Sequence, residues 1–480
     1  MASINLSDKI LKFPENDALI GAKRKISWQE FQEQVTITVR MLKILGIREH
    51  DRVAVLTGNN HDFPLLFFAL LNLRAITVPL RPDLPEPLIQ KNARAAGCCC
   101  LIVLEKAITI SGEFPIRLIS AQELEKVKGG VSKKLTRRQE TAFLFSAEQP
   151  ATILFTSGSG GEPAGIMHTV GNHYFSALGA NRNMTLTEDD RWLIVLPFYH
   201  VSGLSILFRT IIAAAASVIG NTEQQLAVQL SSQHITHVSL VPTQLQRLLD
   251  DPAAAQGFPA LRAVLTGGSQ CPPALTNRAL QTGMPLFLSY GSTEMASQIT
   301  TAGTEELLAN PLSSGKPLLF RRVEIGENSE ILVGGKTLGK PLSGLKKSLA
   351  DSRIQGLSPS GDTGRFDKNG SLIVIGRLDN MFISGGENVY PEEIENALLS
   401  LDAVNAACVV PVPDPAFGAR PVAYVNMKSG NTIDKNSLRS GLEKILPRFK
   451  IPTRFIEWQP EAGQLKPDRK ALRQKAIEFM

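Results

Sequence analysis

A stretch rich in glycine and hydroxyl side chains is the most chemically suggestive feature of the sequence. It reads Thr156-Ser157-Gly158-Ser159-Gly160-Gly161 and follows Pro150–Phe155, an apolar, β-branched run typical of a strand. Glycine lets backbone N–H groups come close to a bulky anion, and the hydroxyls can bond phosphate oxygens. A strand that feeds such a loop can cradle a polyphosphate. A flexible surface loop is the alternative, since neither a Walker sequence nor G-x-G-x-x-G is present.

Two more clusters follow predicted strands. Tyr290-Gly291-Ser292-Thr293-Glu294 comes after Leu286–Leu288, and Gly267-Gly268 comes after Ala263–Thr266. An aromatic ring can stack on a purine, glycines let the backbone meet a flat ring, and a glutamate can hold Mg²⁺ on phosphate. Taken alone, each cluster is also an ordinary strand-to-turn junction.

Three features near the end of the chain have the residue types of a nucleotide enzyme. Asp362 and Arg377, each directly after a glycine, could bind a ribose diol, because a carboxylate accepts from both hydroxyls. Ser384-Gly385-Gly386 is a second glycine turn, and Lys466 precedes the last predicted helix. The structural alternatives are ordinary Gly-Asp turns and a solvated C-terminal lysine.

A histidine, a serine and an arginine could line a pocket for an acid. His200 lies just beyond the predicted strand Ile194–Leu196, although a lone histidine is more often structural. Helical spacing places Arg209 about two turns after Ser202, among large apolar side chains. Burial of that charge needs an anionic partner. The partner is either an aspartate or glutamate of the chain or an anionic group of the substrate.

The elements that must position these residues alternate between strand and helix through the first three hundred residues. This rhythm predicts layered α/β sheets, largely parallel, with ligands beyond the carboxyl ends of the strands. Lys126–Arg138 is interpreted as a surface linker. After Ser313, short glycine-separated segments predict a small antiparallel, β-barrel-like part. A boundary at Gly376–Asn380 divides the chain into an N-terminal domain, 1–377, and a small mobile C-terminal α/β domain, 378–480.

The bulk composition narrows the class of protein. The chain has 480 residues, 43% hydrophobic and 20% charged, as in globular proteins of more than one lobe. A net charge of +6 gives no case for nucleic acid, and five cysteines form no disulfide or zinc pattern, so buried, reduced thiols are expected. No signal peptide or membrane span is predicted. We expect a cytoplasmic protein without membrane insertion, for which a homo-oligomer remains open.

Taken in order, the motifs resemble those of the acyl-adenylate-forming superfamily, which comprises acyl-CoA synthetases, adenylation domains and luciferases. The resemblance covers essentially the whole chain. Within the superfamily, the sequence is most similar to the o-succinylbenzoate–CoA ligases of menaquinone biosynthesis. The supporting motifs are FTSGSGGEP, LPFYHVSG with Arg209, SLVPTQLQRLL, YGSTE, GDTG, GRLDNMFISGGENVYPEEIE and a near-terminal lysine.

The resemblance implies a role for each singled-out residue. Thr156–Gly161 would hold the phosphates of ATP, and Tyr290-Gly291 would lie along adenine near Gly267 and Gly268. Thr293 would contact the α-phosphate, Glu294 would hold Mg²⁺, and Asp362 and Arg377 would bind the ribose. Asp379 would be the hinge, Ser384-Gly385-Gly386 would help to form the thioester-forming face, and His200 would gate the entry of the thiol. Ser202 and Arg209 would bind the second carboxylate of the acid, and Lys466 would catalyse adenylation.

The implied reaction joins a carboxylic acid to coenzyme A in two steps that consume ATP and require Mg²⁺. The carboxylate first attacks the α-phosphorus and expels pyrophosphate, and a thiol then displaces AMP. The alternatives are a ligase for another aryl or small acid, and a degraded homologue that binds nucleotide without turnover. The second is suggested by Gly160 and Ala164, where the family commonly has threonine and lysine, whereas the other motif residues remain. A serine hydrolase is disfavoured, because G-x-S-x-G is absent.

Replacing Lys466 tests the implied division between the two steps. Both reactants of the first step are anions, so a cation between them is the first requirement. Lys466→Ala should nearly abolish adenylate formation but leave thioester formation from supplied acyl-adenylate largely intact. Separate assays of the two half-reactions measure this. Equal losses in both would show that the lysine has no specific part in the first step.

Restoring the missing cation tests the altered phosphate loop. Ala164→Lys should tighten ATP or pyrophosphate binding modestly, by about 1 kcal/mol or less, because water screens an accessible charge. Titration calorimetry measures the change. A loss of activity would instead mean that the loop geometry excludes lysine.

Overall fold

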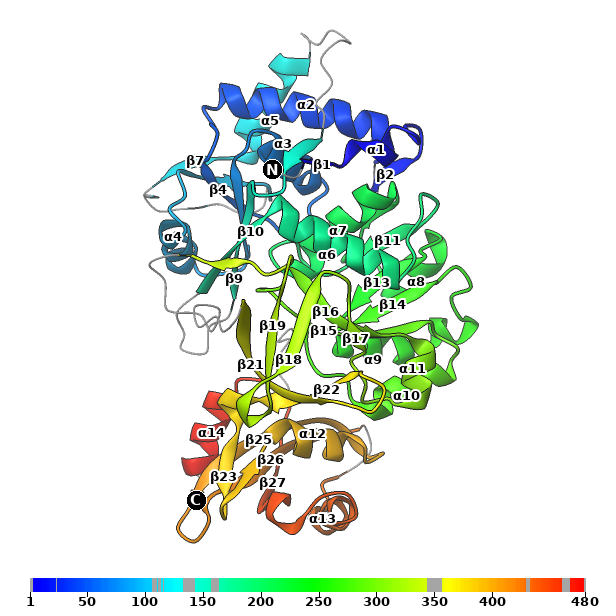
Figure 1. Cartoon of the computed structure of the whole chain (residues 1–480), viewed down its shortest axis with the longest axis vertical. Coiled ribbons are helices and arrows are strands. Elements are labelled where there is room, and N and C mark those ends of the chain that lie inside the picture. The colour runs from blue at the N-terminus through cyan, green and yellow to red at the C-terminus, as the bar shows by residue number, and fades with distance from the viewer. Residues whose placement is uncertain are drawn as a thin grey trace.

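The computed structural model describes residues 3–22, 24–105, 110, 114, 116–132, 143–156, 164–342, 356–428, 432–459 and 467–478. Two large sheets with helices form the upper part of the molecule in Figure 1, and a four-stranded sheet lies below them. The last hundred residues form a small α/β unit beneath that sheet. This is the layered α/β fold with a smaller C-terminal unit that the sequence predicts.

The first large sheet has seven strands, parallel in its centre and antiparallel at one edge. Its order is β20 (Lys340–Pro341), β10 (Ala164–Thr169), β9 (Pro150–Thr156), β5 (Ile76–Leu80), β4 (Arg52–Leu56), β6 (Cys100–Val103) and β7 (Arg117–Ile119). The helices of this part are α2 (Trp28–Ile44), α3 (Phe63–Asn72), α4 (Glu86–Ala95) and α5 (Ala121–Ser132). Helix α2 begins at the capping box of Ser27 and Glu30 expected from the sequence.

The second large sheet has nine strands and a parallel centre of six. Its order is β17 (Lys316–Pro317), β16 (Ser297–Ala302), β15 (Leu286–Ser292), β14 (Ala263–Thr266), β13 (His237–Leu240), β11 (Arg191–Ile194), β12 (Ala216–Ile219), β2 (Asp17–Ile20) and β3 (Lys25–Ser27). Its helices are α6 (Val170–Asn183), α7 (Val201–Ala213), α8 (Leu226–Ser232), α9 (Pro242–Asp250), η1 (Pro252–Gln256), α10 (Pro273–Gln281) and α11 (Thr304–Ala309). A short pair, β1 (Ser3–Asn5) and β8 (Leu144–Ser146), and α1 (Ser7–Ile10) complete this part.

An aromatic cluster fixes α7 between the two sheets. Phe208 of α7 contacts Phe67 of α3 edge-on, with ring centroids 5.8 Å apart, and stacks on His173 of α6 at 4.9 Å. All three side chains are buried, and such aromatic pairs add to the stability gained from buried area. Because Phe208 is anchored on two sides, the orientation of the adjacent residue, Arg209, is also fixed.

The β-barrel-like part is a four-stranded antiparallel sheet in the order β18 (Arg321–Ile325), β19 (Glu330–Gly335), β21 (Leu357–Phe366) and β22 (Leu372–Arg377), with η2 (Glu327–Ser329) between the first two. The C-terminal unit has the sheet β24 (Glu387–Val389), β23 (Phe382–Ser384), β26 (Gly418–Met427) and β25 (Val404–Asp414), and β27 (Arg454–Glu457) pairs with β26. Its helices are η4 (Leu378–Asn380), α12 (Pro391–Leu399), α13 (Lys435–Glu443), η5 (Arg448–Lys450) and α14 (Arg469–Glu478). The predicted boundary at residue 377 falls between β22 and η4, and the division into two domains stays a prediction.

The structure corrects three local predictions. Lys126–Ser132 belongs to α5 rather than to a linker, because the helix continues through Gly129 and Gly130. Tyr290 and Asp362 lie within strands, where the sequence suggested turns, because antiparallel partners extend β15 and β21 through both motifs. Cys99 is exposed, so not every thiol is buried. No helix in the described part of the chain combines the length and apolar character needed to cross a bilayer.

Candidate active site

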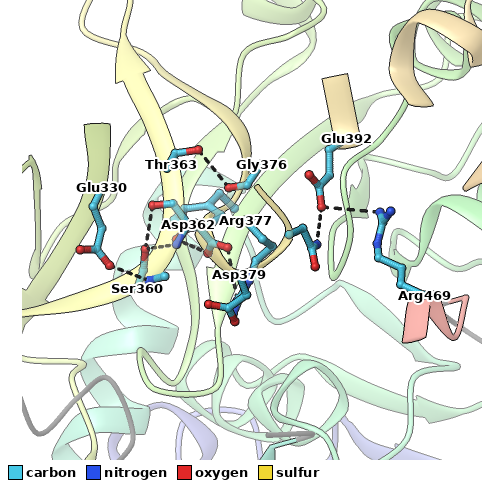
Figure 2. A network of polar contacts seen from close by, with 12 residues as sticks. Glu330, Ser360, Asp362, Thr363, Gly376, Arg377, Asp379, Glu392 and Arg469 are labelled. Carbon is cyan, nitrogen blue, oxygen red and sulfur yellow. Dashed lines mark hydrogen bonds and ion pairs between the residues drawn. The ribbon is translucent and has the colours of Figure 1, made fainter. Parts of the chain in front are cut away.

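The predicted ribose pair lies side by side on the four-stranded sheet. Asp362 of β21 and Arg377 of β22 are register partners, and Arg377 Nη1 lies 3.3 Å from Asp362 Oδ1 (Figure 2). The Tyr290 hydroxyl, from the second large sheet, donates to Asp362 Oδ2 at 2.7 Å. Burial, together with the charge of Asp362, holds the pKa of Tyr290 well above its usual value, so the phenol keeps its proton and remains a donor. The structure thus brings the predicted adenine and ribose residues together.

Arg377 also contacts the predicted hinge residue. Its Nη2 lies 3.0 Å from Oδ2 of Asp379, the second residue of η4 (Figure 2). Burial lowers the pKa of Arg377, but Asp362 and Asp379 more than offset this effect, and the pKa lies above its usual value. Both partners in the Arg377–Asp379 pair are more than two-fifths exposed, so the pair contributes little stability and can be exchanged cheaply. One guanidinium therefore joins the predicted ribose site to the predicted hinge.

Thr293 and Glu294 are held through their backbone carbonyls. His168 Nε2 lies 2.7 Å from the Thr293 carbonyl oxygen, and the Gly339 amide donates to the Glu294 carbonyl oxygen at 2.7 Å. Burial lowers the pKa of His168 to about 4, so its ring is neutral and Nε2 carries the donated proton. His168 lies on β10, the strand that follows the predicted phosphate loop, and sequence reasoning did not single it out.

The backbone around the predicted adenine site requires glycine at two positions. Gly268, just past β14, has φ +84°, a conformation that glycine adopts without strain. A Cβ on Gly291 would lie 2.4 Å from the Ser297 carbonyl oxygen, so only glycine permits the close approach of β15 and β16. Gly267 also follows β14, and a Cβ there would lie 3.1 Å from the Ser289 carbonyl oxygen. These glycines lie at the carboxyl ends of neighbouring strands, as predicted.

His200 and Ser202 lie at the start of α7. His200 is the N-cap residue and is exposed, with its ring centroid 4.7 Å from that of Tyr199, and Ser202 is half-buried in the first turn. A Cβ on Gly203 would lie 2.4 Å from the carbonyl oxygens of Leu196 and Pro197. Glycine therefore lets α7 begin directly against the chain leaving β11, which places His200 and Ser202 beyond a strand end.

Arg209 is buried without a carboxylate partner in the described part of the chain. Its side chain is 1% exposed, its guanidinium lies 5.1 Å from the centre of the Trp192 ring, and Nη2 donates to Ser297 Oγ at 3.1 Å. Nε and Nη1 have no hydrogen-bond partner among the residues that the structure describes. Burial, together with the nearby charge of Arg321, lowers the pKa of Arg209 to about 9. Of the two partners that the sequence left open, the structural aspartate or glutamate is not found among the described residues.

The second glycine turn joins β23 to β24. Gly385 and Gly386 have φ +61° and +87°, and Ser384 pairs with Glu387 across the turn. The Ser384 side chain is fully buried and its Oγ has no partner in the described chain. The turn is therefore fixed in shape by residues with left-handed backbone conformations.

An ion-pair cluster that the sequence did not reveal anchors α14. Arg469, the first residue of α14, donates to both carboxylate oxygens of Glu395, at 2.5 and 2.7 Å, and to the Val409 carbonyl oxygen at 2.8 Å. Arg469 also lies 3.5 Å from Glu392, which accepts from Asn380 of η4 (Figure 2). The segment that carries Lys466 thus leads into a helix that is tied to the hinge.

Several predicted site residues cannot be placed. Ser157, Gly158, Ser159, Gly160, Gly161 and Lys466 lie outside the described residues. Thr156 ends β9, where its hydroxyl lies 3.4 Å from the Ala164 carbonyl oxygen across the loop. Within the described ranges, no group of three or more histidine, cysteine, aspartate and glutamate residues could hold a metal ion. The carboxylate of Glu294 is a ligand of the type that Mg²⁺ prefers, and phosphate oxygens commonly supply further ligands to this ion.

Comparison with known proteins places the chain in a family. Residues 6–340 match the sequence profile of the AMP-binding enzymes, and residues 393–462 match that of the AMP-binding enzyme C-terminal domain. A 2-succinylbenzoate–CoA ligase from Listeria monocytogenes serotype 4b (strain F2365) is 31% identical over 479 residues, 98% of each chain.

Two solved structures of o-succinylbenzoate CoA synthetase from Bacillus subtilis are also similar, each 28% identical with a TM-score of 0.87. One holds the acyl-adenylate intermediate OSB-AMP, and the match covers 98% of this chain and 99% of that one. The other holds ATP and a magnesium ion, with 98% and 100% covered.

Removing Arg469 tests the anchor of α14. Arg469→Ala leaves the buried Glu395 carboxylate without its counter-charge, which should destabilise the C-terminal unit by about 3–5 kcal/mol. Hydrogen–deuterium exchange of peptides from α12, β25 and α14 measures the loss. Arg473→Ala, on an exposed position of the same helix, is the matched control and should change protection by about 0.5 kcal/mol or less. Equal protection from exchange in Arg469→Ala and Arg473→Ala would mean that the Arg469–Glu395 ion pair does not anchor α14.

Proposed function

The chain belongs to the family of AMP-binding enzymes, and we propose that it is an ATP-dependent acid–CoA ligase that converts o-succinylbenzoate to o-succinylbenzoyl-CoA in menaquinone biosynthesis. The similarity to 2-succinylbenzoate–CoA ligases over almost the whole chain, and to a synthetase structure holding OSB-AMP, supports this function. The substrate acid, ATP and CoA are its partners. We propose a cytoplasmic location, since ATP and CoA are supplied there.

The buried guanidinium of Arg209 is the observation that favours this acid. A buried charge with two unpaired donors carries a desolvation penalty that an anion can offset. o-Succinylbenzoate has two carboxylates, of which the reaction activates only one. We propose that Arg209 binds the aromatic carboxylate, which is not activated, and that Ser202, two helical turns earlier on α7, lies along the same ligand.

For the first step, we propose that the Asp362 cluster orients the nucleotide. Asp362 accepts from the ribose hydroxyls, Arg377 supports the sugar, and the Tyr290 ring lies along adenine beside Gly267 and Gly268. The succinyl carboxylate attacks the α-phosphorus, pyrophosphate leaves, and Lys466 offsets the charge that gathers on the phosphate oxygens. Thr293 donates to the α-phosphate. Mg²⁺ at Glu294 would supply additional positive charge on the phosphates.

For the second step, the thiol of CoA must reach the acyl carbon from which AMP departs. We propose that the C-terminal unit turns at Asp379, which withdraws Lys466 and presents the Ser384–Gly386 turn. Both partners in the ion pair between Arg377 and Asp379 are exposed, so the loss of this pair during the rotation would cost little. We propose that His200, which is exposed at the start of α7, gates the approach of the thiol.

One experiment distinguishes the proposed function from two alternatives. It measures the release of AMP in the presence of CoA with each of several acids: o-succinylbenzoate, benzoates and short fatty acids. The proposed function predicts release with o-succinylbenzoate well above that with any other acid. Preference for a benzoate or fatty acid would indicate a different CoA ligase. Nucleotide binding without release for any acid would indicate a degraded homologue, the alternative suggested by Gly160 and Ala164.

Arg209→Ala tests the choice of acid. Recognition of a second carboxylate is worth about 2–4 kcal/mol in transition-state binding, or roughly 30- to 1000-fold in kcat/KM. The variant should lose this factor for o-succinylbenzoate and keep its kcat/KM for 4-oxo-4-phenylbutanoate, which has the same shape without the aromatic carboxylate. Equal losses for the two acids would show that Arg209 only supports the fold.

A further inference from the structure

The turn between β15 and β16 holds two non-glycine residues in left-handed conformations. Ala296 has φ +52° and Ser297 has φ +116°. Conformations of this kind are strained for residues other than glycine and persist only where the surroundings enforce them. They follow Thr293 and Glu294 after one intervening residue, Met295, and Ser292 pairs with Ser297 across the hairpin. The strain therefore lies between the predicted adenylation residues and the buried Arg209.

A second buried arginine holds this turn in place. Arg321 Nε donates to the Gln298 carbonyl oxygen at 2.9 Å, and its Nη2 donates to Ser176 Oγ at 3.1 Å. Ser176 Oγ in turn donates to the Ala296 carbonyl oxygen at 2.7 Å. Both carbonyls that flank Ser297 are thus fixed by buried groups, and these contacts account for how the strained backbone is maintained.

The enforced conformation places the Ser297 hydroxyl against α7. It accepts from Arg209 Nη2 at 3.1 Å, and it lies 3.4 Å from Ser205 Oγ, which is also 3.4 Å from the Ser202 carbonyl oxygen. Ser202, Ser205 and Arg209 share one face of α7, because they are spaced by three and four residues. A serine oxygen that accepts from an arginine still has its own O–H to donate. In the described chain the recorded oxygen nearest to this O–H is Ser205 Oγ, at 3.4 Å, which is longer than the usual length of about 2.5–3.0 Å for a hydroxyl hydrogen bond.

We propose that Ser297 is a specificity-determining residue that donates its hydroxyl proton to the carboxylate held by Arg209. This inference rests on the proposed function, since it concerns the same second carboxylate. The carboxylate then accepts hydrogen bonds from two elements of the fold. Arg209 Nε or Nη1 donates from α7, and the Ser297 O–H donates from the β15–β16 hairpin. The strained turn couples the acid site to Thr293 and Glu294, which lie on the same hairpin.

A purely structural role for Ser297 is the alternative, in which its hydroxyl only orients Arg209 and fills the core. Such a role predicts similar losses for every acid. A role in specificity predicts a loss that depends on whether the acid carries the second carboxylate. The two acids o-succinylbenzoate and 4-oxo-4-phenylbutanoate differ in that group alone.

The test measures kcat and KM for both acids with three variants of the full chain. Ser297→Ala removes the hydroxyl, and Ser297→Gly removes it while relieving the strain at φ +116°, so the glycine variant keeps the fold. Each should lower kcat/KM for o-succinylbenzoate about ten- to a hundred-fold and change that for 4-oxo-4-phenylbutanoate less than about two-fold. Ser217→Ala is the control for the loss of a serine hydroxyl from the protein interior, because Ser217 is buried and its recorded side-chain bond in the described chain is to Thr210. The kcat and KM of Ser217→Ala for both acids should equal those of the unaltered chain.

The outcomes separate this inference from the function on which it rests. If the unaltered chain does not convert o-succinylbenzoate, the proposed function is overturned, and the inference falls with it. If the unaltered chain converts it and Arg209→Ala loses activity selectively, but both Ser297 variants lose equally for the two acids or not at all, only the role of Ser297 is overturned. In the Arg209→Ala background, adding Ser297→Ala should cost less than it does alone, because the two groups act on one anion. Full additivity would contradict the shared site.

Discussion

A guanidinium cation buried among apolar side chains, without a carboxylate from the described chain, is the constraint on which the acid site depends. Taking a charge out of water is costly, and packing alone does not repay it. The ring of Trp192 and the hydroxyl of Ser297 offset part of the cost for Arg209, but two of its donors remain unpaired. We therefore propose that a bound anion completes the electrostatic balance of this site.

The surrounding architecture serves to keep that charge in position. Phe208, anchored on α3 and α6, prevents α7 from turning, and Arg321 fixes the hairpin opposite it. Arg321 is itself buried, but its guanidinium donates to several backbone carbonyls and is thereby satisfied. The two arginines differ in their partners. The described chain fills the donors of Arg321, which indicates a structural role, whereas Nε and Nη1 of Arg209 have no partner in it, and we propose a binding role for Arg209.

The nucleotide site depends on a second shared cation. Arg377 contacts Asp362 on one side and Asp379 on the other, and the polar network continues through Asn380 and Glu392 toward Arg469 (Figure 2). A nucleotide that binds Asp362 would alter the balance of charges around Arg377. It would thereby also alter the contact between Arg377 and Asp379, the proposed hinge. Exposed ion pairs of this kind are weak, which suits a contact that has to be exchanged in every catalytic cycle.

Much of the fold and part of the site could be predicted from the sequence. The β-branched runs before each glycine cluster formed the expected strands, and the apolar residues around Arg209 predicted its burial. Strand pairing is a long-range property, so local turn signals could not show that Tyr290 and Asp362 continue their strands. Ser297 and His168 carry no sequence signal, because their roles arise from partners more than eighty residues away. The positive φ of Ser297 is imposed by tertiary contacts, which no local pattern encodes.

The most direct test of the acid site is a crystal structure of the protein with a non-hydrolysable analogue of the o-succinylbenzoyl adenylate. The quantity to measure is the distance from the aromatic carboxylate oxygens to the guanidinium nitrogens of Arg209. We predict that one oxygen lies about 2.7–3.2 Å from Nε or Nη1, the range of a hydrogen bond. A ligand whose aromatic carboxylate lies elsewhere, with both nitrogens still unpaired, would contradict the account.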